Sequence, residues 1–336
     1  MALNIGVSFD GFAATSEALS LARQAVAAGA RSLWVAEHLG YREAITTCAA
    51  FSSISGGAIL VPTAVSPYLW HPTPTAMSLA TLDELSPNAT ALAIGVGNPL
   101  FLQESGETLD KPIRVVRQFI EALRQLWTGE PVHMEGDLFR LAGARLAFRP
   151  NPIPIYIAAM GPDMLRLSGR IADGVVLSAG LSVQSVQRSL AVCTAAASDK
   201  GRDLETFRRA GYIFFATSED GAEAIDAARV KLAFVLRNKF LAENVRESGI
   251  AIDQPAIIDA IARRDLAAAA ALVPDEAVDM FAIAGTPAHC TRRLLDFIEA
   301  GLNEPVLNIL GSAPNCDLAL DVLRTVLGHP ATAANA

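Results

Sequence analysis

Residues 154–178 read PIYIAAMGPDMLRLSGRIADGVVLS, and this stretch contains the unit that decides the fold. An apolar run at 154–158 precedes a segment of helical periodicity at 164–171, and a second apolar run follows at 174–178. Short apolar runs separated by a helix are typical of parallel strands buried beneath helices. The stretch therefore predicts an α/β fold.

The same alternation continues along the chain in both directions. Candidate strands lie at 3–9, 32–36, 58–64, 91–96, 154–158, 174–178, 210–216 and 306–310. Helical stretches between them include 15–28, 72–85, 111–127, 164–171, 183–198 and 287–300. Eight strands that alternate with helices predict closure into a (β/α)8 TIM barrel.

Two segments interrupt the alternation. Residues 131–148 alternate apolar and polar side chains around Glu135-Gly136-Asp137, which predicts a β-hairpin laid over the barrel. Residues 219–280 are helical in pattern and too long for an ordinary connection, so we expect an insertion between the seventh and eighth strands that helps to wall the active site. Residues 1–330 are expected to form a single domain, and 331–336 a flexible tail.

Composition excludes several classes of function. A formal net charge of −8, with no clustered Lys and Arg, argues against a nucleic-acid partner. The four cysteines and five histidines show no metal-ligand spacing, so no metal site is expected. The first residues lack a basic segment and a long apolar run, which predicts a cytoplasmic protein without a membrane anchor.

In a barrel of this kind the active site lies at the carboxyl ends of the strands. Glu37 and His38 follow the strand at 32–36 and are candidates for proton transfer, because imidazole titrates near neutral pH. A structural histidine is the alternative. The strand at 91–96 leads into Gly97 and Asn98, where glycine lets a ligand approach the backbone.

Small residues follow two further strands. Ala159, Met160 and Gly161 end one strand, and Ser178, Ala179 and Gly180 end the next. Each group precedes the start of a helix, where backbone N–H groups can hold a phosphate or another anion. Tight packing where loops cross is the alternative explanation.

Taken in order, these segments resemble the bacterial-luciferase-like flavin and deazaflavin oxidoreductases. The resemblance is carried by WVAEH at 34–38, SPYLWHP at 66–72, ATLDELS at 80–86, IGVG at 94–97, IAAMGP at 157–162, IADGV at 171–175 and FAIAGTP at 281–287. Within the family, the exit of the third strand is similar to that of the coenzyme F420-dependent methylenetetrahydromethanopterin reductases.

The resemblance implies how a cofactor would be held. A non-prolyl cis peptide is implied near Thr63, Ala64 and Val65, against the central ring of the cofactor. His38 and Asn98 would line the ring, and the small residues at 159–161 and 178–180 would take the ribityl phosphate and tail. Many deazaflavin-using members have a carboxylate where this chain has Asn98, so His38 or Glu37 would supply a proton, or no protein acid is needed.

Three functions remain open at this point. The first is hydride transfer between reduced coenzyme F420 and a small organic substrate; the second is a monooxygenase that uses reduced FMN and O₂; the third is a non-catalytic flavin-binding protein. The rings differ in chemistry, because a flavin reacts readily with O₂ whereas a deazaflavin transfers hydride without activating oxygen. The resemblance also implies a homodimer.

Overall fold

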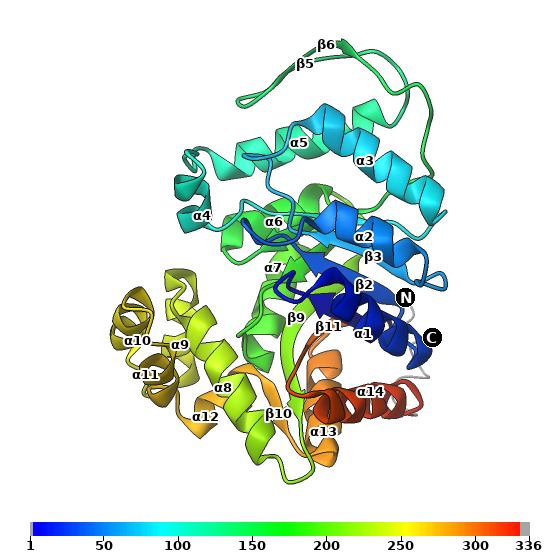
Figure 1. The fold of residues 1–336 in the computed structure, drawn as a ribbon. Coiled ribbons are helices and arrows are strands. Elements are labelled where there is room, and N and C mark those ends of the chain that lie inside the picture. Colours follow the sequence, from blue (N-terminus) through cyan, green and yellow to red (C-terminus); the bar gives the residue numbers. More distant parts are fainter. Residues whose placement is uncertain (1–2, 330–336) are drawn as a thin grey trace.

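The protein is described by a computed structural model that covers residues 3–329, and its centre is a parallel β-barrel (Figure 1). The barrel strands are β1 (Gly6–Phe9), β2 (Ser32–Ala36), β3 (Ile59–Thr63), β4 (Leu92–Ile94), β7 (Ile155–Ala159), β8 (Gly174–Leu177), β9 (Arg208–Thr217) and β11 (Glu304–Leu310). Apart from β3 and β4, each strand pairs in parallel with the next one in this series, and β1 pairs with β11. Between β3 and β4 the barrel closes through the bridges Leu60 to Thr90 and Val65 to Ile94. The predicted TIM-barrel fold is confirmed.

Helices cover the outside of the barrel. They are α1 (Thr15–Ala27), α2 (Ala44–Ser52), α3 (Pro72–Leu85), α4 (Pro99–Glu104), α5 (Pro112–Leu126), α6 (Pro162–Ile171), α7 (Val183–Ser198), α13 (Pro287–Glu299) and α14 (Ala313–Leu327). In α5 the apolar residues recur at helical spacing, from Val116 through Phe119 and Leu123, and all three are buried. They join one large core between the strands and the helices.

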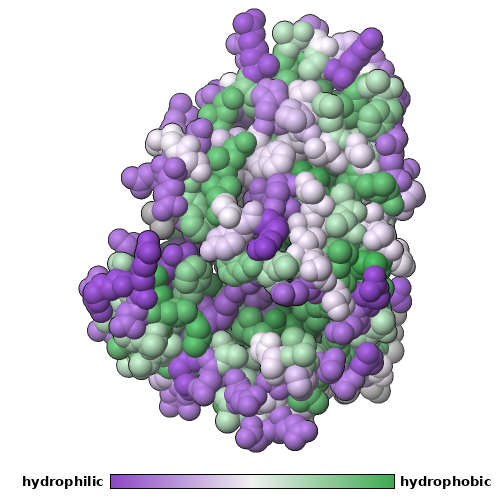
Figure 2. All heavy atoms as spheres, in the orientation of Figure 1, coloured by the Kyte–Doolittle hydropathy of each residue, from purple (hydrophilic) through white to green (hydrophobic). Residues whose placement is uncertain are grey.

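The predicted insertion is helical and has a core of its own. It consists of α8 (Ala222–Leu236), a 3₁₀ turn (Lys239–Leu241), α9 (Ala242–Ser248), α10 (Gln254–Ala262), α11 (Leu266–Ala271) and α12 (Asp275–Phe281). Its apolar residues pack on Phe214 and Ala216 at the end of β9. In Figure 2 these helices form the lobe at the lower left, and the surface is hollowed between this lobe and the rest of the molecule.

One strand was not predicted from the sequence. β10 (Ile283–Gly285) pairs in parallel with residues 215–217 of β9, beyond the part of β9 that pairs with β8. With three residues, it is too short for its apolar pattern to be distinguished from the neighbouring helix ends. It links the insertion to the end of the barrel that carries the active site.

The predicted hairpin exists, but its position corrects one expectation. β5 (Val132–Glu135) and β6 (Arg140–Ala144) pair antiparallel. They lie outside α5 and α3 at the top of Figure 1, where the Asp137 N–H donates to Gln118 of α5 and Phe139 contacts His71. The hairpin therefore covers the outer helices and not the barrel. The predicted tail, 331–336, lies outside the described residues.

Candidate active site

The interior of the barrel is filled in layers. Trp34 forms the middle layer with Tyr156, whose ring stacks on it with centroids 5.8 Å apart, and with apolar side chains of the other strands. Because strand side chains alternate, the next inward positions toward the carboxyl ends are Ser8, Ala36, Thr63, Gly95, Ala158, Ser178, Tyr212 and Asn308. Apart from the ring of Tyr212, these side chains are small or polar. They form the floor at the mouth of the barrel.

The third strand ends in a feature that the family resemblance predicts. The peptide bond between Thr63 and Ala64 is cis. Gly95 on the adjacent β4 segment faces it: a Cβ at position 95 would lie 2.8 Å from the Ala64 Cβ and 3.3 Å from the Ala158 Cβ. Glycine is therefore required at 95 for this arrangement. The side chain of Val65 is fully buried in the core, so only its backbone borders the mouth.

His38 lies at the mouth, and one hydrogen bond defines its tautomer. Its Nδ1 is 3.0 Å from the carbonyl oxygen of Asp10, and a carbonyl only accepts, so Nδ1 carries the hydrogen. The neutral ring therefore has no hydrogen on Nε2. Burial is the main cause that lowers the pKa of His38 below its ordinary value of 6.5, and the cations Lys231 and Arg237 act in the same direction.

Glu37 is held by hydrogen bonds at the entrance to α2. One carboxylate oxygen accepts the Ala44 N–H at 2.9 Å, and the other accepts the indole N–H of Trp70 at 3.3 Å. Burial raises the pKa of Glu37 above its ordinary value of 4.5. Both oxygens of Glu37 are thus engaged in shaping the second and third strand exits.

The other predicted residues border the mouth mainly through their backbone. The side chain of Ala159 is buried in the main core and that of Ala179 in the core of the insertion. Gly161 caps α6 with no side-chain hydrogen bond, and a Cβ there would meet nothing within 4 Å. Gly180 has φ +81° and accepts the Asn244 amide of the insertion at 2.9 Å. The N-terminal end of α6 is therefore open, whereas the β8 exit is covered.

Asn98 lies at the surface, on the α4 side of the mouth. Its carbonyl oxygen accepts the Leu102 N–H at 3.0 Å and so begins α4. The predicted residues thus surround a single mouth, with Glu37 and His38 on one side and Met160 and Gly161 on another.

A group of mouth residues was not identified from the sequence. Asp10 directly follows β1, and its carboxylate forms a 2.9 Å ion pair with Lys231 of α8. The ring centroids of Phe12 and His38 are 4.9 Å apart, and the Lys231 Nζ lies 5.0 Å from the Phe12 centroid. Asp10 follows a strand directly, as Glu37 does, so its position after an apolar run could have identified it. Nothing in the pattern of residues 219–280 singles out Lys231.

The helix α8 crosses one side of the mouth. Lys231 contacts Asp10 at the β1 exit. At the β8 exit, a Cβ added to Gly180 would lie 3.2 Å from the Val235 side chain. Just beyond the helix, the Asn238 side-chain amide lies 3.6 Å from the Met160 sulfur at the β7 exit. These positions are spaced by four and three residues and so share one face. The prediction that the insertion helps to wall the mouth agrees with these contacts.

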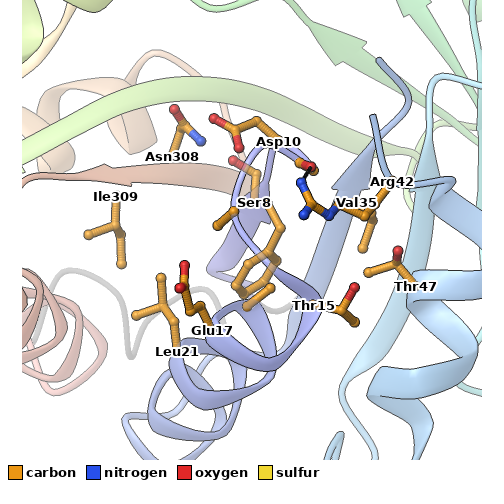
Figure 3. A pocket seen from close by; sticks show the side chains of 14 residues that line it. Ser8, Asp10, Thr15, Glu17, Leu21, Val35, Arg42, Thr47, Asn308 and Ile309 are labelled. Carbon is orange, nitrogen blue, oxygen red and sulfur yellow. Dashed lines mark hydrogen bonds between the residues drawn. The ribbon is translucent and has the colours of Figure 1, made fainter. Parts of the chain in front are cut away.

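A cavity of about 190 Å³ lies where β1 and β11 end (Figure 3). Ser8, Asp10 and Asn308 point to one side of the strands, whereas Leu21 and Ile309 point to the other. The Asn308 side-chain oxygen is buried without a hydrogen-bond partner. The floor of the mouth therefore contains an acceptor that a bound ligand can satisfy.

Neither metal nor membrane features occur in the described part of the chain. Residues 3–329 contain no group of three His, Cys, Asp or Glu side chains placed to hold a metal ion. No helix among them is long and apolar enough to span a bilayer.

Comparison with known families agrees with this geometry. The model of the luciferase-like monooxygenases matches residues 6–304. The chain belongs to this family. Among luciferase-like relatives, the 5,10-methylenetetrahydromethanopterin reductases of Archaeoglobus fulgidus and Methanolobus tindarius are 28% and 30% identical, over 81% and 83% of this chain and 83% and 85% of their own. An F420-dependent glucose-6-phosphate dehydrogenase of Nocardia farcinica is 27% identical over 76% of this chain and 73% of its own.

A luciferase-like solved structure has the same fold. The coenzyme F420-dependent tetrahydromethanopterin reductase of Methanopyrus kandleri superposes with a TM-score of 0.86, at 24% identity, over 96% of this chain and 98% of that one. This agreement supports the arrangement of the barrel, the hairpin and the insertion.

Proposed function

We propose that this luciferase-like oxidoreductase transfers hydride between reduced coenzyme F420 and a small organic substrate at the mouth of the barrel. The observation that carries the proposal is the floor of small and polar side chains at the barrel mouth, bordered by His38. The names of the relatives, which include an F420-dependent dehydrogenase, support the choice of coenzyme.

The residues fit a flat tricyclic ring with a phosphate-bearing tail. The floor consists mostly of small side chains, Gly95 lets the Ala64 bulge approach a ring placed there, and the buried Asn308 oxygen lacks a donor. The open N-terminus of α6 at Gly161 presents N–H groups that suit a phosphate. When bound there, the coenzyme would supply a carbon centre that gives or takes hydride.

His38 is the proposed proton-transfer residue. Because Nδ1–H donates to Asp10, the neutral ring presents an unprotonated Nε2, which can take a proton from a substrate hydroxyl as hydride leaves the adjoining carbon. In the reverse direction the same nitrogen, once protonated, gives the proton to a carbonyl oxygen. Glu37 is proposed to position this side of the mouth, since its oxygens bond Ala44 and Trp70.

A reduced-FMN monooxygenase is the second candidate, favoured by the family model, which is that of the luciferase-like monooxygenases. Asn98 agrees with it, because the family resemblance implies a carboxylate there in many deazaflavin-using members. The protein should be mixed with reduced F420 and a panel of small aldehydes and ketones, under argon and in air. We expect the coenzyme to be oxidised at the same rate in both, with one alcohol formed per coenzyme. Substrate oxidation that requires O₂ and reduced FMN would support the monooxygenase instead.

We also propose that the chain forms a homodimer through its outer helices. Met77 and Leu85 are each about half exposed on α3, beside the third strand, and such exposed apolar side chains favour a protein contact. Light scattering should give twice the mass of the chain; a monomer at assay concentration would contradict the proposal.

A further inference from the structure

One cation near the mouth differs from comparable arginines of the chain. Six arginines among residues 3–329 are half-buried, and five of them bond a carboxylate or a backbone carbonyl: Arg202, Arg208, Arg209, Arg229 and Arg293. Arg237 is the sixth, and no carboxylate of the described chain lies within the 4 Å range of an ion pair with it. Its guanidinium stacks on the Phe234 ring, 3.9 Å from the centroid.

Arg237 is held at the mouth by its neighbours in sequence. It ends α8, six residues after Lys231, which is tied to the β1 exit, and one residue before Asn238, which contacts Met160 at the β7 exit. Its charge acts on His38, so the guanidinium lies within electrostatic range of the proposed proton-transfer residue. Arg237 therefore belongs to the segment of the insertion that crosses the mouth.

Exposed apolar side chains lie on the elements that border the same mouth. Phe12 and Met160 are 38% and 37% exposed, on opposite sides of the α8 crossing, and Phe240 is 67% exposed just after it. Tyr41 extends the rim, with its ring 4.5 Å from that of Phe12. A cation without a carboxylate partner and exposed apolar side chains at the same mouth suit a ligand that has an apolar body and a negative group.

We propose that Arg237 binds the anionic group of an organic substrate, a carboxylate or phosphate ester, and so sets the substrate class of the mouth. That the bound anion is a substrate rests on the function proposed above, whereas the presence of an anion site does not. Stacking on Phe234 fixes the plane of the guanidinium and directs its N–H groups sideways, where a carboxylate can accept two of them. Partial burial costs the arginine part of its hydration, which a bound anion replaces.

The same anion could instead come from the tail of the coenzyme, and the test separates the two sources. Benzoate and benzamide share a ring and differ in charge, so their affinities for the coenzyme-free protein measure the charge preference directly. Binding of each should be measured by calorimetry for the wild type, for Arg237→Gln and for Arg246→Gln. Arg246 is an exposed control in the same insertion that pairs only with Glu243. Affinity for F420 should be measured for all three.

We expect the wild type to bind benzoate about tenfold more tightly than benzamide, or about 1.4 kcal/mol. Arg237→Gln should abolish that preference while F420 affinity stays unchanged, and Arg246→Gln should preserve both. Arg237→Lys keeps the charge and should retain a weaker preference for benzoate over benzamide. This variant tests the proposal if the glutamine substitution disturbs folding.

The proposal is overturned if the wild type shows no preference, if Arg237→Gln keeps it, or if that variant weakens F420 binding and leaves benzoate binding intact. The last result would assign the cation to the coenzyme tail. Because the benzoate assay contains no coenzyme, a failure of hydride transfer would refute the proposed function without touching the anion site.

Discussion

At the scale of single residues, one contact sets the tautomer of His38. Its Nδ1 lies against the Asp10 carbonyl, so its Nε2 is the basic atom of the neutral ring, and burial keeps the ring neutral by lowering its pKa. The position of His38 after a strand was readable from the sequence, because the apolar run before it marks the strand end. Its tautomer was not, because it depends on the backbone of Asp10, 28 residues away.

The pH dependence of turnover should therefore follow His38. Protonation removes the basic Nε2, so oxidation of a substrate hydroxyl should fall as pH decreases through the lowered pKa, below 6.5. His38→Gln should lose this acid limb and reduce kcat/KM by about 10² to 10⁴. The profile of His133→Gln, changed at an exposed histidine on the hairpin, should match the wild type. An unaltered acid limb in His38→Gln would assign the titration to another group.

At the scale of elements, α8 matters most because it joins the insertion to the barrel mouth. The helical character of residues 219–280 was predictable from composition and length. The pairing of Lys231 with Asp10 was not, because 221 residues separate them and only the closed barrel brings them together. The place of Arg237 at the mouth could not be predicted for the same reason.

Removal of the Lys231 charge should raise the pKa of His38. Lys231 opposes the charged imidazole, whereas Asp10 favours it, so Lys231→Met removes the opposing charge and leaves the Asp10 carboxylate unpaired. Both changes raise the pKa of His38. An NMR titration of the imidazole measures the shift, and Lys239→Met, at an exposed position, is the matched control. A lower or unchanged pKa would show that α8 does not lie against His38 in solution.

The packing of α6 on α7 depends on one glycine. A Cβ at Gly169 would lie 2.1 Å from the Cys193 carbonyl oxygen, so the two helices would have to separate. Gly169→Ala is expected to lower the free energy of unfolding by about 3 kcal/mol, despite the better helix propensity of alanine. Arg170→Ala, the next and exposed residue, should change it by less than about 0.5 kcal/mol. Urea titrations compare the two, and equal stabilities would refute this packing.

At the scale of the whole molecule, the eight-strand barrel was predictable because each strand is an apolar run bounded by turns and helices. The position of the hairpin outside α5 and α3 was not, since it depends on contacts such as Asp137 with Gln118. Burial of Phe214 and Ala216 in the core of the insertion joins that lobe to β9, which leads us to propose that barrel and insertion form one folding unit.

A single unfolding transition should follow. The three tryptophans, Trp34, Trp70 and Trp127, all lie before the insertion, so their fluorescence reports the barrel, whereas far-UV circular dichroism also reports the helices at 222–281. We expect the two signals to share one midpoint in urea. Loss of helical signal before the change in fluorescence would show that the insertion unfolds as a separate domain.

The central claim, that this mouth holds a deazaflavin for hydride transfer, is tested most directly by titration of the protein with F420 and FMN side by side. Ring fluorescence reports binding in both cases. The geometry at Gly95, the Asn308 oxygen and the α6 N-terminus suits either ring. The F420-dependent relative leads us to predict that F420 binds at least about tenfold more tightly, a difference of about 1.4 kcal/mol. Tighter binding of FMN, with O₂ consumed by the reduced complex, would contradict the account.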